Sequence, residues 1–214
     1  MARISASILG FLFDARRKKE SNDVMITRIN KALKEREKDF DILHFDIEDG
    51  KFVKYKSFTP AQLSKIKCNK KREVHLMVVD YEQYLQDYFG FADMFIFHSE
   101  VLKSNFSKTI DYLKMNNKYV GIAVESNTHV DEIKYLDKVD IVLVMAIHPG
   151  LPGQKFIDTA LNKIKRLVQV RKDRKLKFLI EVDGGINKEN MQKVIDAGAD
   201  ILEMGTGFFK MQNA

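Results

Sequence analysis

The regular alternation of short apolar runs with longer amphipathic segments constrains the fold of this chain most. Eight runs recur about every 27 residues along the 214-residue chain, and apolar residues with helical spacing fill most of the intervals between them. The expected strands cover residues 3–9, 43–50, 74–78, 94–97, 120–124, 141–145, 178–182 and 201–204. The expected helices cover residues 25–40, 81–89, 102–115, 157–171 and 188–197, with a short helix from Pro60 and another ending near Leu136. This alternation predicts a parallel α/β fold, either a closed (β/α)8 barrel or a doubly wound open sheet.

Polar residues and glycine turns at the ends of the predicted strands favour the closed barrel. A barrel gathers the carboxyl ends of its strands and the eight following loops into one mouth, and an open sheet gathers them less completely. The polar residues at these ends include His44, Asp46, His75, His98, Glu100 and Asp183. We therefore predict a single-domain (β/α)8 TIM barrel over residues 1–214. Only residues 205–214 follow the last strand, so the last outer helix should be short or absent.

Composition excludes several classes of protein. With 45% hydrophobic residues the chain can bury one large core. Its single cysteine, Cys68, excludes an internal disulfide and fits a reducing compartment. No apolar run approaches the ~20 residues of a membrane span, and the N-terminus has no signal-peptide core. We therefore expect a soluble, cytoplasmic protein with no membrane partner.

The net charge suits an anionic ligand rather than a nucleic acid. The 36 basic and 30 acidic residues leave a charge of +6 at neutral pH. Much of the excess lies between Lys163 and Lys177, opposite an apolar helical stripe, which indicates a solvated helix surface. This segment has no aromatic residue after Phe156 to interleave with the basic ones, so we expect no nucleic-acid partner.

The second predicted strand, residues 43–50, carries the strongest chemical signal. With a side-chain period of two, His44, Asp46 and Glu48 share one face, while Phe45 and Ile47 share the other. The apolar pair would face a covering layer, and the polar trio would face inward. Burying such groups costs about 2 kcal/mol or more for each one left unpaired. Either a divalent metal ion or a buried hydrogen-bond network must therefore meet them.

Two imidazoles and two carboxylates come together if the barrel forms. His44 and Asp46 lie on the second strand, His75 on the third, and Asp183 just past the seventh. Imidazole with carboxylate suits Zn²⁺, Fe²⁺, Mn²⁺ or Co²⁺. We therefore predict one divalent transition metal ion per chain, with Zn²⁺ or Fe²⁺ ahead of Mn²⁺ or Co²⁺.

Three glycine-rich turns after the sixth, seventh and eighth strands indicate a phosphate site. They cover residues 149–154, 184–187 and 205–207. Glycine lets backbone N–H groups approach an anion closely, and Asn187 and Thr206 would each begin a helix there. Glycines can also simply form tight turns, but three adjacent turns at this end of a barrel are typical of phosphate binding.

In these motifs and in their order, the chain resembles the ribulose-phosphate 3-epimerase family of ribulose-phosphate-binding barrels. The similarity is collinear and covers nearly the whole chain. It is carried by SASIL at 5–9, HFDIEDGKFV at 44–53, VHLMV at 74–78, HSE at 98–100, VMAIHPG at 144–150, GQKF at 153–156, EVDGG at 181–185 and GT at 205–206.

The resemblance implies a metal-dependent 3-epimerase of the pentose phosphate pathway, which interconverts D-ribulose 5-phosphate and D-xylulose 5-phosphate. It implies that Asp46 and Asp183 are the two acid/base groups, one on each face of an enediolate, and that both bind the metal ion with His44 and His75. It also implies a homo-oligomer. The implied substrate-binding residues are Ser7, His75, Met77, Met145, Gly150, Gly153, Gly184, Gly185, Gly205 and Thr206.

Several positions depart from the family pattern, namely Ala6, Glu48, Glu125-Ser126 and Pro152. Glu48 stands where a methionine is usual, and it would place negative charge beside an anionic intermediate unless Lys51, Lys54 or Lys56 neutralises it.

Three other functions stay open at this point. A 3-epimerase of a six-carbon ketose phosphate, such as allulose 6-phosphate, would use the same machinery. A decarboxylase or aldol-type enzyme would need Asp-x-Lys-x-x-Asp, but Asp46 is followed by Ile47-Glu48. A non-catalytic sugar-phosphate-binding barrel is suggested by Glu48, Pro152 and the short C-terminal segment, and the retained metal ligands and acid/base carboxylates argue against it.

Overall fold

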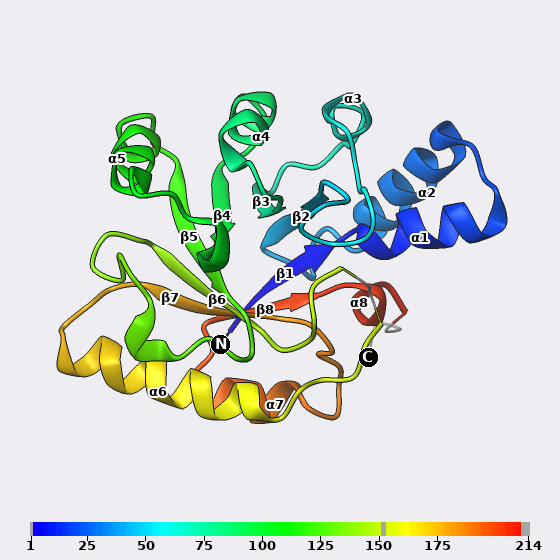
Figure 1. Ribbon diagram of the computed structural model, residues 1–214. Coiled ribbons are helices and arrows are strands. Elements are labelled where there is room, and N and C mark those ends of the chain that lie inside the picture. Colours follow the sequence, from blue (N-terminus) through cyan, green and yellow to red (C-terminus); the bar gives the residue numbers. More distant parts are fainter. Residues whose placement is uncertain (1, 151–152, 211–214) are drawn as a thin grey trace.

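Eight parallel strands close into a barrel in the computed structural model, which describes residues 2–150 and 153–210 (Figure 1). Neighbouring strands pair in chain order, and β1 closes the ring by pairing with β8. The predicted (β/α)8 barrel is confirmed. Its strands are β1 (Arg3–Ser7), β2 (Ile42–Glu48), β3 (Lys71–Met77), β4 (Met94–His98), β5 (Tyr119–Val124), β6 (Ile141–Met145), β7 (Leu179–Asp183) and β8 (Ile201–Met204).

The helices lie outside the barrel, as Figure 1 shows. They are α1 (Leu9–Lys18), α2 (Asn22–Glu35), α3 (Pro60–Leu63), α4 (Tyr81–Tyr88), α5 (Phe106–Met115), α6 (Thr159–Asp173), α7 (Met191–Asp196) and α8 (Thr206–Lys210), with 3-10 turns η1 (Ser99–Val101) and η2 (Val130–Glu132). The final helix, α8, is 5 residues long within the described chain, which agrees with the expected short last helix.

The register of the strands determines which side chains meet inside the barrel. Asp46 of β2 is paired with His75 of β3, and Asp183 of β7 is paired with Glu203 of β8. On β2, Phe45 and Ile47 are buried in the apolar layer between strands and helices. Because side chains alternate along a strand, the polar residues of β2 face the interior, as predicted.

The barrel interior is divided into an apolar part and a polar part. The apolar cluster draws mainly on β4, β5 and β6; its buried members are Ile42, Met94, Ile96, Ala123, Ile141, Leu143, Met145, Ile147 and Ile201. The buried polar residues come mainly from the other strands and include Ser5, Ser7, His44, Asp46, Glu48, Glu73, His75, His98, Glu181, Asp183 and Glu203. The chemistry is therefore concentrated on the arc that runs from β7 through β1 to β3.

Helix α1 was not predicted. The first strand was expected to reach Leu9, but it ends at Ser7, and Leu9 begins α1. Only Leu9, Leu12 and Ala15 are buried along this helix, and its last turn is basic, so the apolar stripe is too narrow to stand out as helical periodicity.

The helix expected to end near Leu136 was also wrong, because the structure has only the turn η2 there. Val130, Ile133 and Leu136 are buried at a spacing of three, which imitates the pattern of a helix. Tyr135, however, has a φ of 64°, and a residue in this left-handed region interrupts a right-handed helix.

Overpacking the barrel interior at β5 should destabilise the fold. A Cβ at Gly121 would lie 3.0 Å from Cγ1 of Ile96 and 3.3 Å from the backbone oxygen of Ile141. We expect Gly121→Val to lower the free energy of unfolding by about 1–3 kcal/mol, measured by urea denaturation. Gly90→Val is the control, because a Cβ at Gly90 has no neighbouring atom within 4 Å among the described residues. Equal stability of the two variants would contradict the tight packing at β5.

Candidate active site

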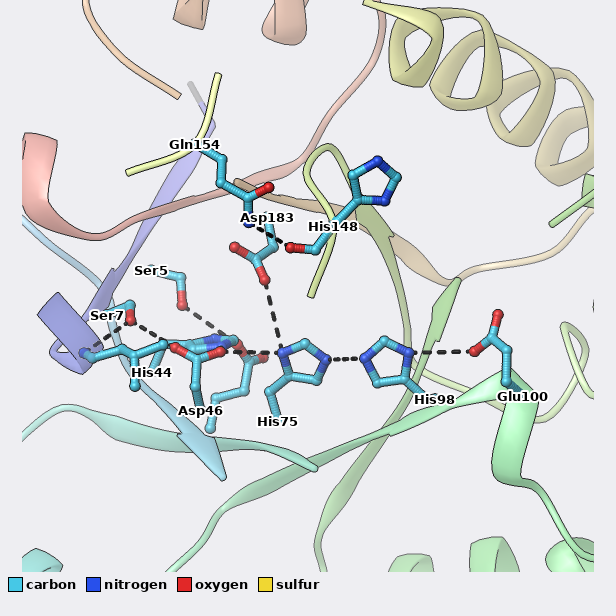
Figure 2. Close-up of polar contacts among 12 residues, drawn as sticks. Ser5, Ser7, His44, Asp46, His75, His98, Glu100, His148, Gln154 and Asp183 are labelled. Carbon is cyan, nitrogen blue, oxygen red and sulfur yellow. Dashed lines mark hydrogen bonds and ion pairs between the residues drawn. The ribbon is translucent and has the colours of Figure 1, made fainter. Parts of the chain in front are cut away.

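Four buried side chains converge at the mouth of the barrel, as Figure 2 shows. One ligand atom from each of His44, Asp46, His75 and Asp183 lies within 4.8 Å of the others. Nε2 of His44 lies 3.2 Å from Oδ1 of Asp46, and Nδ1 of His75 lies 3.3 Å from the same oxygen. Asp183 approaches the group with Oδ2 at 3.8 Å from Nδ1 of His75. The structure thus brings together the four residues predicted from three strands, and two imidazoles with two carboxylates are a suitable donor set for a transition metal ion.

Neighbouring polar groups orient this set. Nδ1 of His44 lies 2.7 Å from Oε1 of Glu73, which leaves Nε2 facing the other ligands. Ser7 donates a hydrogen bond of 2.8 Å from Oγ to Oδ2 of Asp46, so the other oxygen, Oδ1, faces the two histidines. A carboxylate behind a metal-binding histidine is a common device for fixing the imidazole tautomer. Glu73 was missed in the sequence, although it lies two residues before His75 on the same strand face.

A second chain of contacts fixes His75. Its Nε2 lies 2.9 Å from Nε2 of His98, and Nδ1 of His98 lies 3.3 Å from Oε2 of Glu100 (Figure 2). Burial lowers the pKa of His98 to about 4, so this imidazole is neutral at pH 7. Its Nδ1–H donates to Glu100, and its Nε2 accepts from Nε2–H of His75. Nδ1 is thus the nitrogen of His75 that faces Asp46.

The electrostatic field separates the buried carboxyl groups into two kinds. Burial acts to raise the pKa of Asp46, but the neighbouring His44 and His75 hold it well below its usual range. Burial and the charge of Glu73 raise the pKa of Glu181 well above its usual range, and burial with the charge of Asp183 does the same for Glu203. The imidazoles thus favour the ionised form of Asp46, and the neighbouring carboxylates favour the neutral forms of Glu181 and Glu203.

Glu48 belongs to the neutral kind. Burial and the charge of Asp46 raise the pKa of Glu48 to about 8. Within the described residues, neither of its carboxyl oxygens has a hydrogen-bond partner. The cation that acts on it is Arg16 of α1, and not one of the three lysines considered in the sequence. The expected negative charge at Glu48 is therefore largely absent at neutral pH.

A cavity of about 200 Å³ opens at the metal-ligand group. It is lined by the two aspartates, by Glu203, and by most of the residues expected to bind substrate, namely Ser7, Met77, Met145, Gly150, Gly153, Gly184, Gly185 and Gly205. His75 lies fully buried beside it. Thr206 begins α8 as expected, and its side chain lies outside the described part of the structure.

The glycine turns around this cavity need glycine for two reasons. Gly150, Gly153, Gly184 and Gly185 have φ values between 68° and 112°, a region that other residues rarely adopt. At Gly185 a Cβ would also lie 2.4 Å from the backbone nitrogen of Phe156, so the turn after β7 rests directly on the loop after β6. Asn187 was predicted to begin a helix, but the helix α7 begins only at Met191. Pro152, one of the departures from the family pattern, lies outside the described residues.

The site can be compared with known proteins. The sequence model of the ribulose-phosphate 3 epimerase family matches residues 21–209. The chain belongs to this family. It is thus an epimerase, an isomerase that acts on carbohydrates, and the resemblance noted in the sequence is confirmed.

Relatives of known name agree with the family assignment. The ribulose-phosphate 3-epimerase of Buchnera aphidicola subsp. Baizongia pistaciae is 34% identical over 180 residues, which cover 81% of this chain and 78% of the relative. The enzyme of the same name from Bacillus subtilis is 33% identical over 174 residues, which cover 79% of this chain and 80% of the relative.

Solved structures of other enzymes share the barrel. KGPDC from Streptococcus mutans has a TM-score of 0.65 at 12% identity and covers 100% of this chain and 92% of its own. Orotidine 5'-monophosphate decarboxylase from Methanocaldococcus jannaschii has a TM-score of 0.60 at 16% identity, and the match covers 100% of this chain and 93% of the decarboxylase chain. Likeness at such low identity shows the fold alone.

Among the described residues, the helices are too short or too polar to cross a membrane.

Replacing Glu48 by methionine should stabilise the protein, and more so at higher pH. The pKa of Glu48 is raised to about 8 in the folded chain, so the folded state binds this proton more tightly, and stability is lost as pH rises from about 5 to about 8. The Glu48→Met variant has no carboxyl group at this position, so it does not lose stability in this way as pH rises. It also removes a buried carboxyl group that has no hydrogen-bond partner among the described residues. We expect its free energy of unfolding to exceed that of wild type by about 1–3 kcal/mol at pH 8, with a smaller difference at pH 5.

Urea denaturation in the presence of a chelator measures this difference without a contribution from metal binding. Glu189→Met, at an exposed position, is the control and should show little dependence on pH. A gain for Glu48→Met that is the same at pH 5 and pH 8 would contradict the raised pKa.

Proposed function

We propose that this chain interconverts D-ribulose 5-phosphate and D-xylulose 5-phosphate by moving a proton at C3. The observation that carries the proposal is the placement of Asp46 and Asp183. They come from β2 and β7, on either side of β1 and β8 in the closed barrel, and both line one cavity. Inversion at a carbon next to a ketone needs one proton-transfer group on each face of a planar intermediate, and this arrangement supplies two.

One divalent transition metal ion would be held by His44, Asp46, His75 and Asp183. The fit rests on four buried ligand atoms within 4.8 Å of one another and on nitrogens oriented by Glu73 and His98. Imidazole with carboxylate favours Zn²⁺ or Fe²⁺, with Mn²⁺ or Co²⁺ as alternatives. Such an ion supplies positive charge next to the oxygens of the reacting carbons.

The side chains of the cavity would carry out the proton transfers. One aspartate takes the C3 proton, the electrons of the C–H bond move toward the C2 carbonyl oxygen, and the other aspartate returns a proton to the opposite face. Ser7, by donating to Oδ2 of Asp46, holds that carboxylate in place. Met77 and Met145 line the same cavity and would exclude water from the planar intermediate, since both are almost fully buried.

Glycine turns would receive the phosphate. Gly184, Gly185 and Gly205 line the cavity and follow β7 and β8, at the end where barrels of this type commonly bind phosphate. Glycines leave backbone N–H groups open to an anion, so the proposed recognition uses backbone donors.

Kinetics with defined substrates tests the proposal directly. Metal-loaded protein should epimerise D-ribulose 5-phosphate with higher kcat/KM than D-allulose 6-phosphate, and a chelator should abolish the reaction until metal is restored.

His75→Ala should purify with little metal by elemental analysis, because it loses one of four ligands. His129→Ala, an exposed histidine, should retain it. Full activity of wild type after complete removal of metal would contradict the assignment of the ligand set, and a preference for the six-carbon substrate would correct the proposed substrate.

Gly205→Val should raise KM for the sugar phosphate at least tenfold, with a smaller effect on kcat. Among the described residues, chain neighbours aside, a Cβ at Gly205 would lie no closer than 3.8 Å to another atom. The backbone can therefore tolerate valine, but the branched side chain would occupy cavity space where the phosphate approaches the turn. Steady-state kinetics measures the effect, and Gly90→Val serves as a control with unchanged KM. An unchanged KM in Gly205→Val would place the phosphate elsewhere.

Removing one aspartate should separate proton exchange from epimerisation. Asp183→Asn leaves Asp46 to take the C3 proton from one epimer and to return solvent hydrogen to the same face. In heavy water, NMR should show deuterium uptake at C3 of one epimer without conversion, and Asp46→Asn should label the other epimer. Both variants must first be shown to bind metal. Interconversion at near wild-type rate in both, or labelling of the same epimer by both, would contradict the two-base mechanism.

A further inference from the structure

A buried carboxyl group on β8 lies in the cavity and has no part in the functions described so far. Glu203 is 5% exposed and lines the cavity, while its neighbours on β8, Ile201, Leu202 and Met204, are apolar and buried. Strand pairing places it opposite Ser5 of β1 and Asp183 of β7. Glu203 therefore occupies an inward position at the centre of the polar arc.

The position of Glu203 lies between the two ends of the proposed substrate. On one side is Asp183, whose charge acts on the Glu203 carboxyl and whose side chain is hydrogen-bonded to it. On the other side is Gly205, where the position of an added Cβ lies 3.8 Å from Oε1 of Glu203 and 4.0 Å from Cβ of Ser7. Glu203 thus lies between the proposed acid/base residue Asp183 and the glycine turn proposed to bind the phosphate.

Placing a carboxyl group here costs stability that an apolar side chain would not cost. It is desolvated and lies beside another carboxylate, which opposes its ionisation. A ligand with hydroxyl groups would offset that cost, because a hydroxyl donates to a carboxyl oxygen whether that carboxyl is ionised or neutral.

We propose that Glu203 is a specificity-determining residue that accepts a hydrogen bond from the substrate hydroxyl between the reacting carbon and the phosphate. The assignment rests on the proposed function. In a pentulose 5-phosphate, C2 and C3 lie at the acid/base groups and the phosphate is on C5, so the intervening hydroxyl is the one on C4. That hydroxyl has the same configuration in both C3 epimers, and one residue can therefore serve the reaction in both directions.

Comparison of a substrate with its 4-deoxy analogue tests this contact. The readout is deuterium uptake at C3 in heavy water, which both compounds can show. In wild type, kcat/KM should fall roughly 10- to 100-fold from D-ribulose 5-phosphate to its 4-deoxy analogue, as expected for the loss of a buried hydrogen bond to a carboxyl group. In Glu203→Val, the two compounds should differ by less than about threefold. Glu203→Gln keeps an acceptor oxygen and should retain most of the discrimination.

Glu181→Gln is the matched control. Glu181 is also a buried glutamate on an adjacent strand, but it is not among the residues that line the cavity. Its variant should discriminate between the two compounds as wild type does, even if its turnover changes. Metal content is measured in every variant, because partial loss of metal lowers the rates with both compounds and leaves their ratio unchanged.

The outcomes separate this inference from the function on which it rests. If metal-loaded wild type fails to epimerise D-ribulose 5-phosphate, the proposed function fails and the inference fails with it. If wild type epimerises that substrate but handles the 4-deoxy analogue equally well, the role of Glu203 is wrong and the function stands. The same conclusion follows if Glu203→Val discriminates as strongly as wild type. The wild-type comparison needs no variant, so equal rates with the two compounds would overturn the role of Glu203 even if Glu203→Val does not fold, and Glu203→Gln then serves to assign the contact.

Discussion

The interior of this barrel depends on the cost of removing carboxyl groups from water. Asp46, Asp183, Glu73, Glu181 and Glu203 are all at least nine-tenths buried, and isolated charges in such a place would not be tolerated. The chain meets this cost in two ways. Imidazoles lie beside Asp46 and favour its ionised form, and neighbouring carboxylates favour the neutral forms of Glu181 and Glu203. A site that carries both kinds of carboxyl group is well suited to proton transfer.

Barrel closure makes this arrangement possible. The pairing of β1 with β8 brings the carboxylates of β7 and β8 next to Ser7 and the residues of β2. An open sheet with the same strands would leave β1 and β8 apart, and Asp46 would lose its neighbours on one side. The apolar cluster on β4 to β6 fills the rest of the interior. The polar side chains of the arc therefore pack against apolar side chains and not against solvent.

The sequence predicted the strands and the closed barrel, because apolar runs recur at regular spacing and polar residues mark their carboxyl ends. It predicted the four convergent ligands because a closed barrel gathers those strand ends into one mouth. It did not predict the contact of Glu73 with His44 or the place of Glu203 in the cavity, since a single glutamate in a strand does not reveal whether it faces a cavity, another side chain or solvent. Helix α1 was missed because tertiary contacts at three residues hold it, and the turn η2 was mistaken for a helix because three buried residues share helical spacing. The sequence also did not reveal that Arg16, and not a lysine of the following loop, acts on Glu48, because distances between side chains cannot be inferred from their separation in the sequence.

The contact between Gly185 and the backbone of Phe156 has a consequence for the evolution and engineering of this barrel. The turn after β7 and the loop after β6 share a surface with no room for a side chain, and the hydrogen bond from Ile157 N to Ala146 O ties the base of that loop to the end of β6. The two segments are therefore packed as one unit. A loop engineered after β6 has to keep the backbone path at Phe156, because the glycine turn opposite leaves no room for a side chain.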